Sequence, residues 1–354
     1  MKDKLKKWMK TYPIIWASYW RVKQELKRLL MMSYFLYDAN LAYQFMFWGS
    51  RQRNRRRLSA ELLFQYHKIE KGLVMPGPKR LFGIDPVLAV MDLLKQWQEN
   101  NFEIDDPIYL GAVESLTSYH DLLSTAGLDT DKIILPRVTE FLNCISVRDI
   151  DLKTPYKLPQ LDVTGKNPIE SFENLMQARR SVRDFRTQPV DLTLIKKAVE
   201  LAQLSPSACN RQPWKVYLVS DPDDMKTLLS HQNGNRGFGH LAPHVAIITA
   251  DSQCFFDSSE RNEPFVDGGM FAMSLILSLR AQEIATCCLN WCVPPSTDKT
   301  VHQIFKIPRS EKIIMLLAIG YPSDGVSVPR SVRFPAIQVL NKIASTYSSS
   351  DRRT

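Results

Sequence analysis

The sequence predicts a mainly helical N-terminal region followed by an α+β domain, in which helices cover a central sheet. Up to about residue 150, apolar residues recur at three-to-four spacing between Pro or Gly breaks, which is typical of helices. Beyond residue 168, short β-like runs alternate with helical patterns. Residues 154–168 hold three prolines, a glycine and polar residues without a helical period, so they are the expected linker.

The elements follow from these local patterns in chain order. In the N-terminal region we expect helices at 58–67, 86–97, 107–123 and 136–147. In the second region we expect helices at 169–180, 191–203 and 265–281, and strands at 215–219, 245–250, 285–289 and 313–319. The expected division is therefore 1–153 helical and basic, 154–168 linker, 169–345 α+β domain, and 346–354 disordered tail.

The net charge of the 354 residues is +9, and it is concentrated at one end. Residues 1–57 hold 14 Lys/Arg and 3 Asp/Glu, whereas the remaining 297 residues are nearly balanced. With 44% hydrophobic residues, the composition excludes a wholly disordered chain. The six cysteines form no CxxC pair and no apolar leader pattern follows the charged start, so we expect free thiols in a reducing cytoplasm.

Residues 29–48 form a stretch of 20 residues rich in Phe, Tyr, Met and Leu, which is long enough for a membrane-spanning helix. Asp38, Asn40 and Gln44 within this stretch argue against a span, and basic residues flank both of its ends. We expect aromatic-rich helices that cover a protein core, with peripheral contact of residues 1–57 with an anionic membrane as the alternative. Nucleic-acid binding is not expected, because no reading module accompanies the basic residues.

The common catalytic signatures are absent from the sequence. It contains no GxSxG elbow, phosphate loop, HExxH or GxGxxG after a strand. His240 and His244 are four residues apart, but Pro243 lies between them and no carboxylate completes a ligand set, so no metal site is expected.

Three polar clusters remain, each at the end of a predicted element. They are RRSVRDF at 179–185, SPSACNRQPW at 205–214, and GYP at 320–322 with PRSVRFP at 329–335. Arginines suit a phosphate and electron-rich ring oxygens, while Ser, Asn and Gln suit the edge of a heterocycle. Together the clusters provide what a bound flavin mononucleotide (FMN) needs, although each alone also fits an ordinary polar turn.

On these motifs and the helix DGGMFAMSLILSLRAQEIATCC, residues 169–340 resemble the FMN-dependent nitroreductase family. The resemblance implies an α+β homodimer with a mostly antiparallel sheet and FMN at the subunit interface. It also implies ping-pong transfer of hydride from NAD(P)H through flavin N5 to a nitro, quinone, enone or sugar-linked acceptor.

The resemblance also implies the site residues, with no metal and no catalytic side chain. Those expected to bind FMN are Arg179, Arg180, Ser181, Arg183, Pro206, Ser207, Asn210, Leu289, Asn290, Arg330 and Arg333. Pro206, Ser207 and Asn210 would reach the FMN of the partner subunit. On the substrate side the expected residues are Asn235, Arg236 and Trp291. Asn290 and Trp291 depart from the small residues common in the family, so Trp291 either narrows the cleft or packs.

The segment HKIEKGL, residues 67–73, resembles one found upstream of nitroreductase domains in bacterial surface-polysaccharide gene clusters. This suggests a role in polysaccharide biosynthesis. A charged helix end that Gly72 closes accounts for His67 and Glu70 at least as well as a catalytic role does. The competing function is a catalytically silent scaffold that docks at a membrane or a polysaccharide-assembly complex.

Overall fold

The structure, a computed structural model, describes residues 8–48, 54–75, 78–130, 133–145, 167–329, 333 and 335–342. Most of the expected linker, Arg330 and the expected tail at 346–354 lie outside the described residues.

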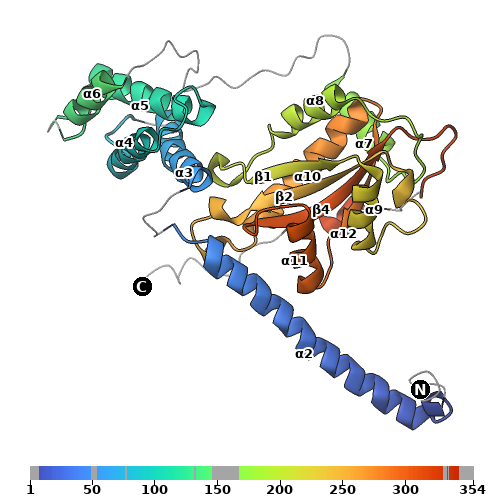
Figure 1. Ribbon diagram of the computed structural model, residues 1–354. Helices are drawn as coiled ribbons and strands as arrows, with labels where there is room; N and C mark the ends of the chain where they lie inside the picture. The colour runs from blue at the N-terminus through green and yellow to red at the C-terminus, as the bar shows by residue number, and fades with distance from the viewer. Residues whose placement is uncertain are drawn as a thin grey trace.

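The first described element is α2 (Pro13–Phe45), a single helix of 33 residues that begins with proline at its first turn. It extends away from the rest of the molecule (Figure 1), and only Leu41 and Ala42 of this helix are buried. The expectation of aromatic-rich helices covering a core is therefore wrong for most of residues 29–48, whose apolar side chains lie in solvent. In the part of the chain that the structure describes, no helix has both the length and the hydropathy that a membrane crossing requires.

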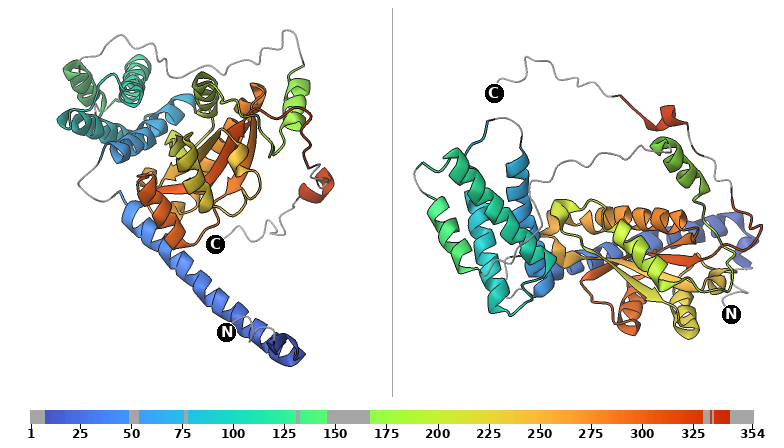
Figure 2. Two further views of the ribbon diagram at one scale, coloured as in Figure 1. Left: turned by 45° about the vertical axis from the view of Figure 1, so that its right-hand side comes forward. Right: turned by 90° about the horizontal axis from the view of Figure 1, so that it is seen from above.

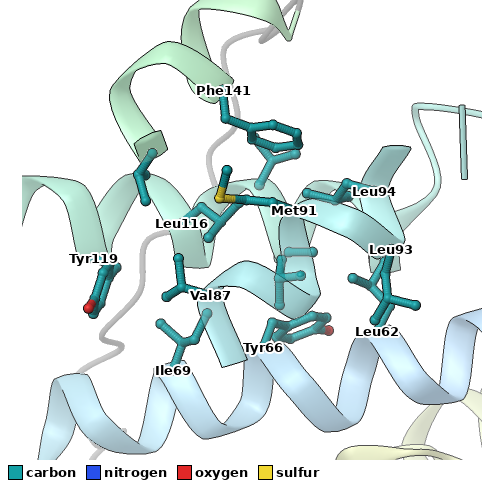
Figure 3. Close-up of a cluster of buried hydrophobic side chains, with 14 of the residues drawn as sticks. Leu62, Tyr66, Ile69, Val87, Met91, Leu93, Leu94, Leu116, Tyr119 and Phe141 are labelled. Carbon is teal, nitrogen blue, oxygen red and sulfur yellow. The ribbon is translucent and has the colours of Figure 1, made fainter. Parts of the chain in front are cut away.

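Four helices then form a bundle with its own core: α3 (Arg55–Val74), α4 (Ile84–Glu99), α5 (Pro107–Ala126) and α6 (Leu135–Cys144). All four were predicted, but α3 extends seven residues beyond its predicted end at residue 67. Their apolar positions converge on one cluster in which Tyr66 and Ile69 of α3 meet Val87 and Leu94 of α4 and Leu116 of α5 (Figure 3). The periodicity of the sequence is thus sufficient to define this core.

Gly72 does not end α3, contrary to expectation, since the helix continues to Val74. An added Cβ at Gly72 would lie 2.0 Å from Cε2 of Phe82, so the glycine lets that aromatic ring approach the helix backbone.

The second region contains a four-stranded sheet of β1 (Trp214–Val219), β2 (His244–Asp251), β3 (Ala285–Asn290) and β4 (Glu311–Gly320). The strand order is β1-β2-β4-β3 and every neighbouring pair is antiparallel. All four predicted strands are confirmed. β1 and β3 are the two edge strands, which matters for the site described below.

Helices cover both faces of the sheet (Figures 1 and 2). Ala246 and Ile248 of β2 pack with α8 (Leu192–Ala202) and α10 (Glu263–Ala281). Val245 and Ile247 pack with α9 (Pro222–Ser230) and α11 (Pro295–Ile304). Successive residues of a strand point to opposite faces, and here both faces are buried. The remaining helices are α7 (Pro168–Ala178) and the short α12 (Ala336–Val339); α9, α11 and α12 were not predicted.

The bundle and the sheet domain meet at a junction centred on Arg211, whose side chain is 1% exposed. Its guanidinium binds both carboxylate oxygens of Glu260 at 2.6 and 2.9 Å and donates to the carbonyl oxygen of Cys254 at 2.9 Å. The rings of Trp48 and Phe64, from the N-terminal region, both lie 5.7 Å from the guanidinium. A buried ion pair surrounded by aromatic rings thus holds the two parts together.

Candidate functional site

The segment Arg179–Asp184 runs beside the edge strand β3. Ser181 forms a parallel bridge with Thr286, and the backbone N–H of Val182 donates to the carbonyl oxygen of Thr286 at 3.0 Å. The segment follows α7, whose N-terminus is capped by Asn167. The three arginines of the segment, Arg179, Arg180 and Arg183, thereby lie along this edge of the sheet.

The arginines of this segment keep donors available for a ligand. Arg183 is exposed, and its guanidinium lies 5.6 Å from the centre of the Phe238 ring. The Nε atom of Arg179 is buried and has no hydrogen-bond partner among the described residues. Arg180 and Ser181 are half-buried in the same place. An unpaired buried donor is costly, so this arrangement fits an acceptor-rich ligand.

The positive charge of these arginines acts on the two thiols of β3, Cys287 and Cys288. Burial raises the pKa of the Cys287 thiol, and the nearby Arg183 opposes this effect. Arg179 acts in the same way on the pKa of Cys288, which burial also raises. The pKa of each thiol is therefore raised, and neither has the depressed pKa of a nucleophilic cysteine.

The loop at residues 232–235 is hydrogen-bonded to Asn290, the last residue of β3. The side-chain nitrogen of Gln232 donates to the backbone and side-chain oxygens of Asn290 at 3.0 and 3.1 Å. Asn235 Nδ2 donates to the carbonyl oxygens of Leu229 at 2.8 Å and Gln232 at 2.6 Å. The amide nitrogen of Asn235, expected to contact substrate, is thus used to hold the loop. Gln232, which organises the loop, was missed by the sequence analysis because nothing in its neighbourhood marks it as buried.

Arg236, in the same loop, is exposed and lines a pocket of about 540 Å³ together with Lys226 and His240. Leu289 is buried in the core between the sheet and its helices. Trp291 is half-buried, and its indole N–H donates to Asp298 at 2.9 Å. Of the two roles expected for Trp291, this hydrogen bond favours packing.

The loop before β1 has an unusual backbone. Cys209, Asn210 and Gln212 have φ angles of 50°, 54° and 48°, in the left-handed region that side chains other than glycine rarely adopt. The backbone N–H of Ala208 donates to both oxygens of Asp267, at 3.3 and 3.2 Å. Strained backbone of this kind persists only where the surroundings impose it, and it gathers at functional sites.

Other contacts fix the same loop from both sides. Ser207 Oγ accepts from the backbone N–H of Gln212 at 3.0 Å. Arg56 of α3 donates to the carbonyl oxygen of Gln212 at 2.7 Å. Pro206 and Asn210 are exposed at the loop surface. The loop is therefore held rigidly while it presents two of its expected ligand-binding residues to solvent.

The predicted site residues thus form two groups that are attached to opposite edges of the sheet. One group lies along β3, the other precedes β1, and strands β2 and β4 separate these edges. At roughly 4.8 Å per strand spacing, the edge strands lie about 14 Å apart. At the C-terminus, Arg333 is exposed, and Arg330 lies outside the described residues.

The remaining polar motifs do not extend the site. His67 and Glu70 lie 3.1 Å apart on α3. His244 begins β2, where it is buried and bound to Val190 and Ser220. Among the residues described, no group of three or more His, Cys, Asp or Glu could hold a metal ion.

The family model described as Nitroreductase family matches residues 176–232 and 225–321. The C-terminal half carries a nitroreductase family domain. The match spans the group along β3, the loop before β1 and the whole sheet, and with it the expected α+β nitroreductase-like fold is confirmed. Residues 1–175, with α2 and the helical bundle, lie outside the matched range, as does Arg333.

Known proteins similar to this chain include animal iodotyrosine deiodinases. One from Nematostella vectensis is 23% identical over 240 residues, which cover 60% of this chain and 90% of that protein. The iodotyrosine dehalogenase 1 homolog of Caenorhabditis elegans is 27% identical over 212 residues, covering 51% of this chain and 64% of that protein.

Solved structures similar to the nitroreductase domain include a nitroreductase family protein from Streptococcus pneumoniae. It is 21% identical with a TM-score of 0.42, and the likeness covers 49% of this chain and all of that one. A nitroreductase family protein from Clostridium difficile is 18% identical with a TM-score of 0.42, covering 48% of this chain and 97% of that one.

Proposed function

We propose that this protein is an FMN-dependent oxidoreductase that takes hydride from NAD(P)H and passes it to a small-molecule acceptor. The observation that carries the proposal is the Arg179–Arg183 segment, which lies inside the matched nitroreductase region and is fixed to the edge of the sheet. A two-part ligand with a phosphate and an electron-rich ring matches the donors that this segment offers.

The residues present fit FMN on two counts. The buried Nε of Arg179, without a hydrogen-bond partner among the described residues, supplies a donor directed at an acceptor-rich group. The exposed guanidinium of Arg183, supported by the Phe238 ring, supplies positive charge beside the sheet edge. The chemistry that FMN supplies when bound is the transient storage of a hydride.

The chain's own side chains hold and tune the site in this proposal. Arg183 stabilises negative charge that develops on the ring edge, and Arg179, Arg180 and Ser181 bind the cofactor beside it. The Gln232–Asn290 hydrogen bonds fix the end of β3, next to the segment that would bind FMN. Arg330 and Arg333 remain proposed phosphate ligands.

The two groups of site residues support a homodimer. Because they are attached to opposite edges of one sheet, we assign them to different copies of the chain in each complete site. Pro206, Ser207 and Asn210 of one copy would then complete the site built on β3 of the other. The rigid backbone of this loop suits such a role, since its ordering cost is met before binding.

We propose that the acceptor is a nitro, quinone, enone or sugar-linked compound. A sugar-linked acceptor would place the protein in polysaccharide biosynthesis. The relatives named iodotyrosine deiodinases add a halogenated phenol to the acceptors worth testing. The competing proposal, a catalytically silent scaffold, predicts that FMN is not bound at all.

A matched pair of arginine variants tests the cofactor site. Arg183→Ala is expected to raise the dissociation constant for FMN by about 10- to 100-fold, because a charge-assisted contact is lost. Arg186→Ala is the control: this arginine lies three residues away, pairs with Asp324 at the surface and is not among the proposed FMN-binding residues. The measurement is a titration of FMN fluorescence quenching. Equal affinity of Arg183→Ala and wild type would remove Arg183 from the site.

A further inference from the structure

An uninterrupted apolar stripe runs along the exposed side of α2. Ile15, Val22, Leu29, Leu36 and Tyr43 recur at every seventh position, and their side chains are 40%, 60%, 64%, 71% and 85% exposed. Residues seven apart drift by only about 20° around a helix, so the five side chains share one face over roughly 42 Å.

The opposite side of α2 is the one that contacts the protein body. The hydroxyl of Tyr37 donates to Asp298 at 2.8 Å, and Lys312 lies 3.3 Å from Asp38. Leu41 and Ala42 are buried on the same side. The helix extends away from the rest of the molecule (Figure 1). The exposed fractions of the five side chains show that nothing in the described part of the chain covers the stripe.

Basic side chains lie around the rest of the same stretch of α2. Arg21, Lys23, Lys27 and Arg28 are all exposed, and Glu25 is the single acidic residue between positions 13 and 37. Tryptophans occur in the same stretch, with Lys23 over the ring of Trp20 at 4.5 Å. Long basic side chains and indole rings are the groups that prefer the boundary between lipid headgroups and acyl chains.

We propose that α2 lies flat on a bilayer that contains anionic lipid, with its apolar stripe at the boundary between headgroups and acyl chains. The charge is complementary, because residues 1–57 carry a net +11 while the remainder is nearly neutral. A helix that combines exposed apolar side chains with basic residues is typical of such surface binding. Pairing with a second copy through the seven-residue repeat is disfavoured, since it brings like charges together.

Vesicle flotation of the full-length protein tests this binding, and it does not depend on the proposed FMN chemistry. The probes are vesicles of phosphatidylcholine alone and with about a third phosphatidylglycerol. The wild type is expected to float with the anionic vesicles and to be released as salt rises. The double variants Leu29→Glu/Leu36→Glu and Lys23→Glu/Lys27→Glu are each expected to lower the bound fraction by about 10-fold or more.

The control is Ile337→Glu, which replaces a side chain that is 85% exposed on α12 and should leave flotation unchanged. Circular dichroism verifies that the variants retain their helices, as expected for changes at exposed positions. The proposal would be overturned if the wild type did not float with the anionic vesicles. It would also be overturned if the Leu29→Glu/Leu36→Glu variant floated as the wild type does. Loss of a dimer in this variant by light scattering, without wild-type flotation, would assign the stripe to a second copy instead.

Discussion

Arg211→Ala is expected to lower the free energy of unfolding by about 3–5 kcal/mol, because it leaves a largely buried carboxylate without its counter-charge. Glu260 is 15% exposed and both of its oxygens accept from this arginine. The same substitution removes the donor to the carbonyl oxygen of Cys254 and one of the two donors to that of Ala208, which keeps the backbone N–H of residue 211. The rings of Trp48 and Phe64 also lose the guanidinium between the bundle and the sheet domain.

Urea denaturation of wild type and variant measures this loss. Arg186→Ala is again the matched control, because Arg186 and Asp324 are 49% and 93% exposed and their ion pair is worth less than about 1 kcal/mol. If the two variants lose equal stability, the junction is not held by the buried pair. If the substitution shifts only the unfolding transition of the helical bundle, Arg211 stabilises the bundle and not the sheet domain.

Asp267→Asn is expected to stabilise the protein near neutral pH. Burial raises the pKa of Asp267 to about 6. The hydrogen bond from the Ala208 N–H lowers this pKa, whereas the neighbouring Glu263 raises it further. The ordinary value is 3.8, so between about pH 4 and 6 the folded protein retains a proton that the unfolded chain has lost. Stability therefore falls as pH rises through this window, by about 1–3 kcal/mol in total.

The asparagine removes the charge and keeps an oxygen that can accept from the Ala208 N–H. Thermal denaturation from about pH 4 to 8 should show that the melting temperature of the variant, relative to that of the wild type, increases as pH rises. The melting temperature of the variant should also depend less on pH. Glu263→Gln, one turn earlier on α10, lowers the Asp267 pKa and should give a smaller gain. A variant that is less stable than wild type across the whole range would show that the carboxylate itself is needed to hold the loop.

Much of the fold could be predicted because apolar periodicity alone determines it. The bundle helices and the buried strands have clear three-to-four or continuous apolar patterns, and both appear close to the expected bounds. α9 and α11 were missed because each is short, begins with proline and alternates polar residues with few buried ones. α2 was misjudged since an apolar face predicts burial without saying what covers it.

The sequence names candidate site residues but not how the fold arranges them. The motif RRSVRDF marks the arginines that lie beside β3, whereas sequence spacing cannot show that the loop at 205–214 precedes the opposite edge strand. Arg211 illustrates the limit: within SPSACNRQPW it reads as one more surface charge, yet it is nearly fully buried. Long-range partners such as Glu260 and Trp48 decide its role, and they are distant in the sequence.

The visible absorption spectrum of the purified protein, followed by anaerobic addition of NAD(P)H, tests the central claim most directly. We predict flavin absorption in the blue that is lost when NADH or NADPH is added, since the proposed site holds FMN within reach of a hydride donor. Colourless protein that also fails to bind added FMN would contradict the oxidoreductase and favour the scaffold. Yellow protein that neither nicotinamide bleaches would contradict the proposed donor.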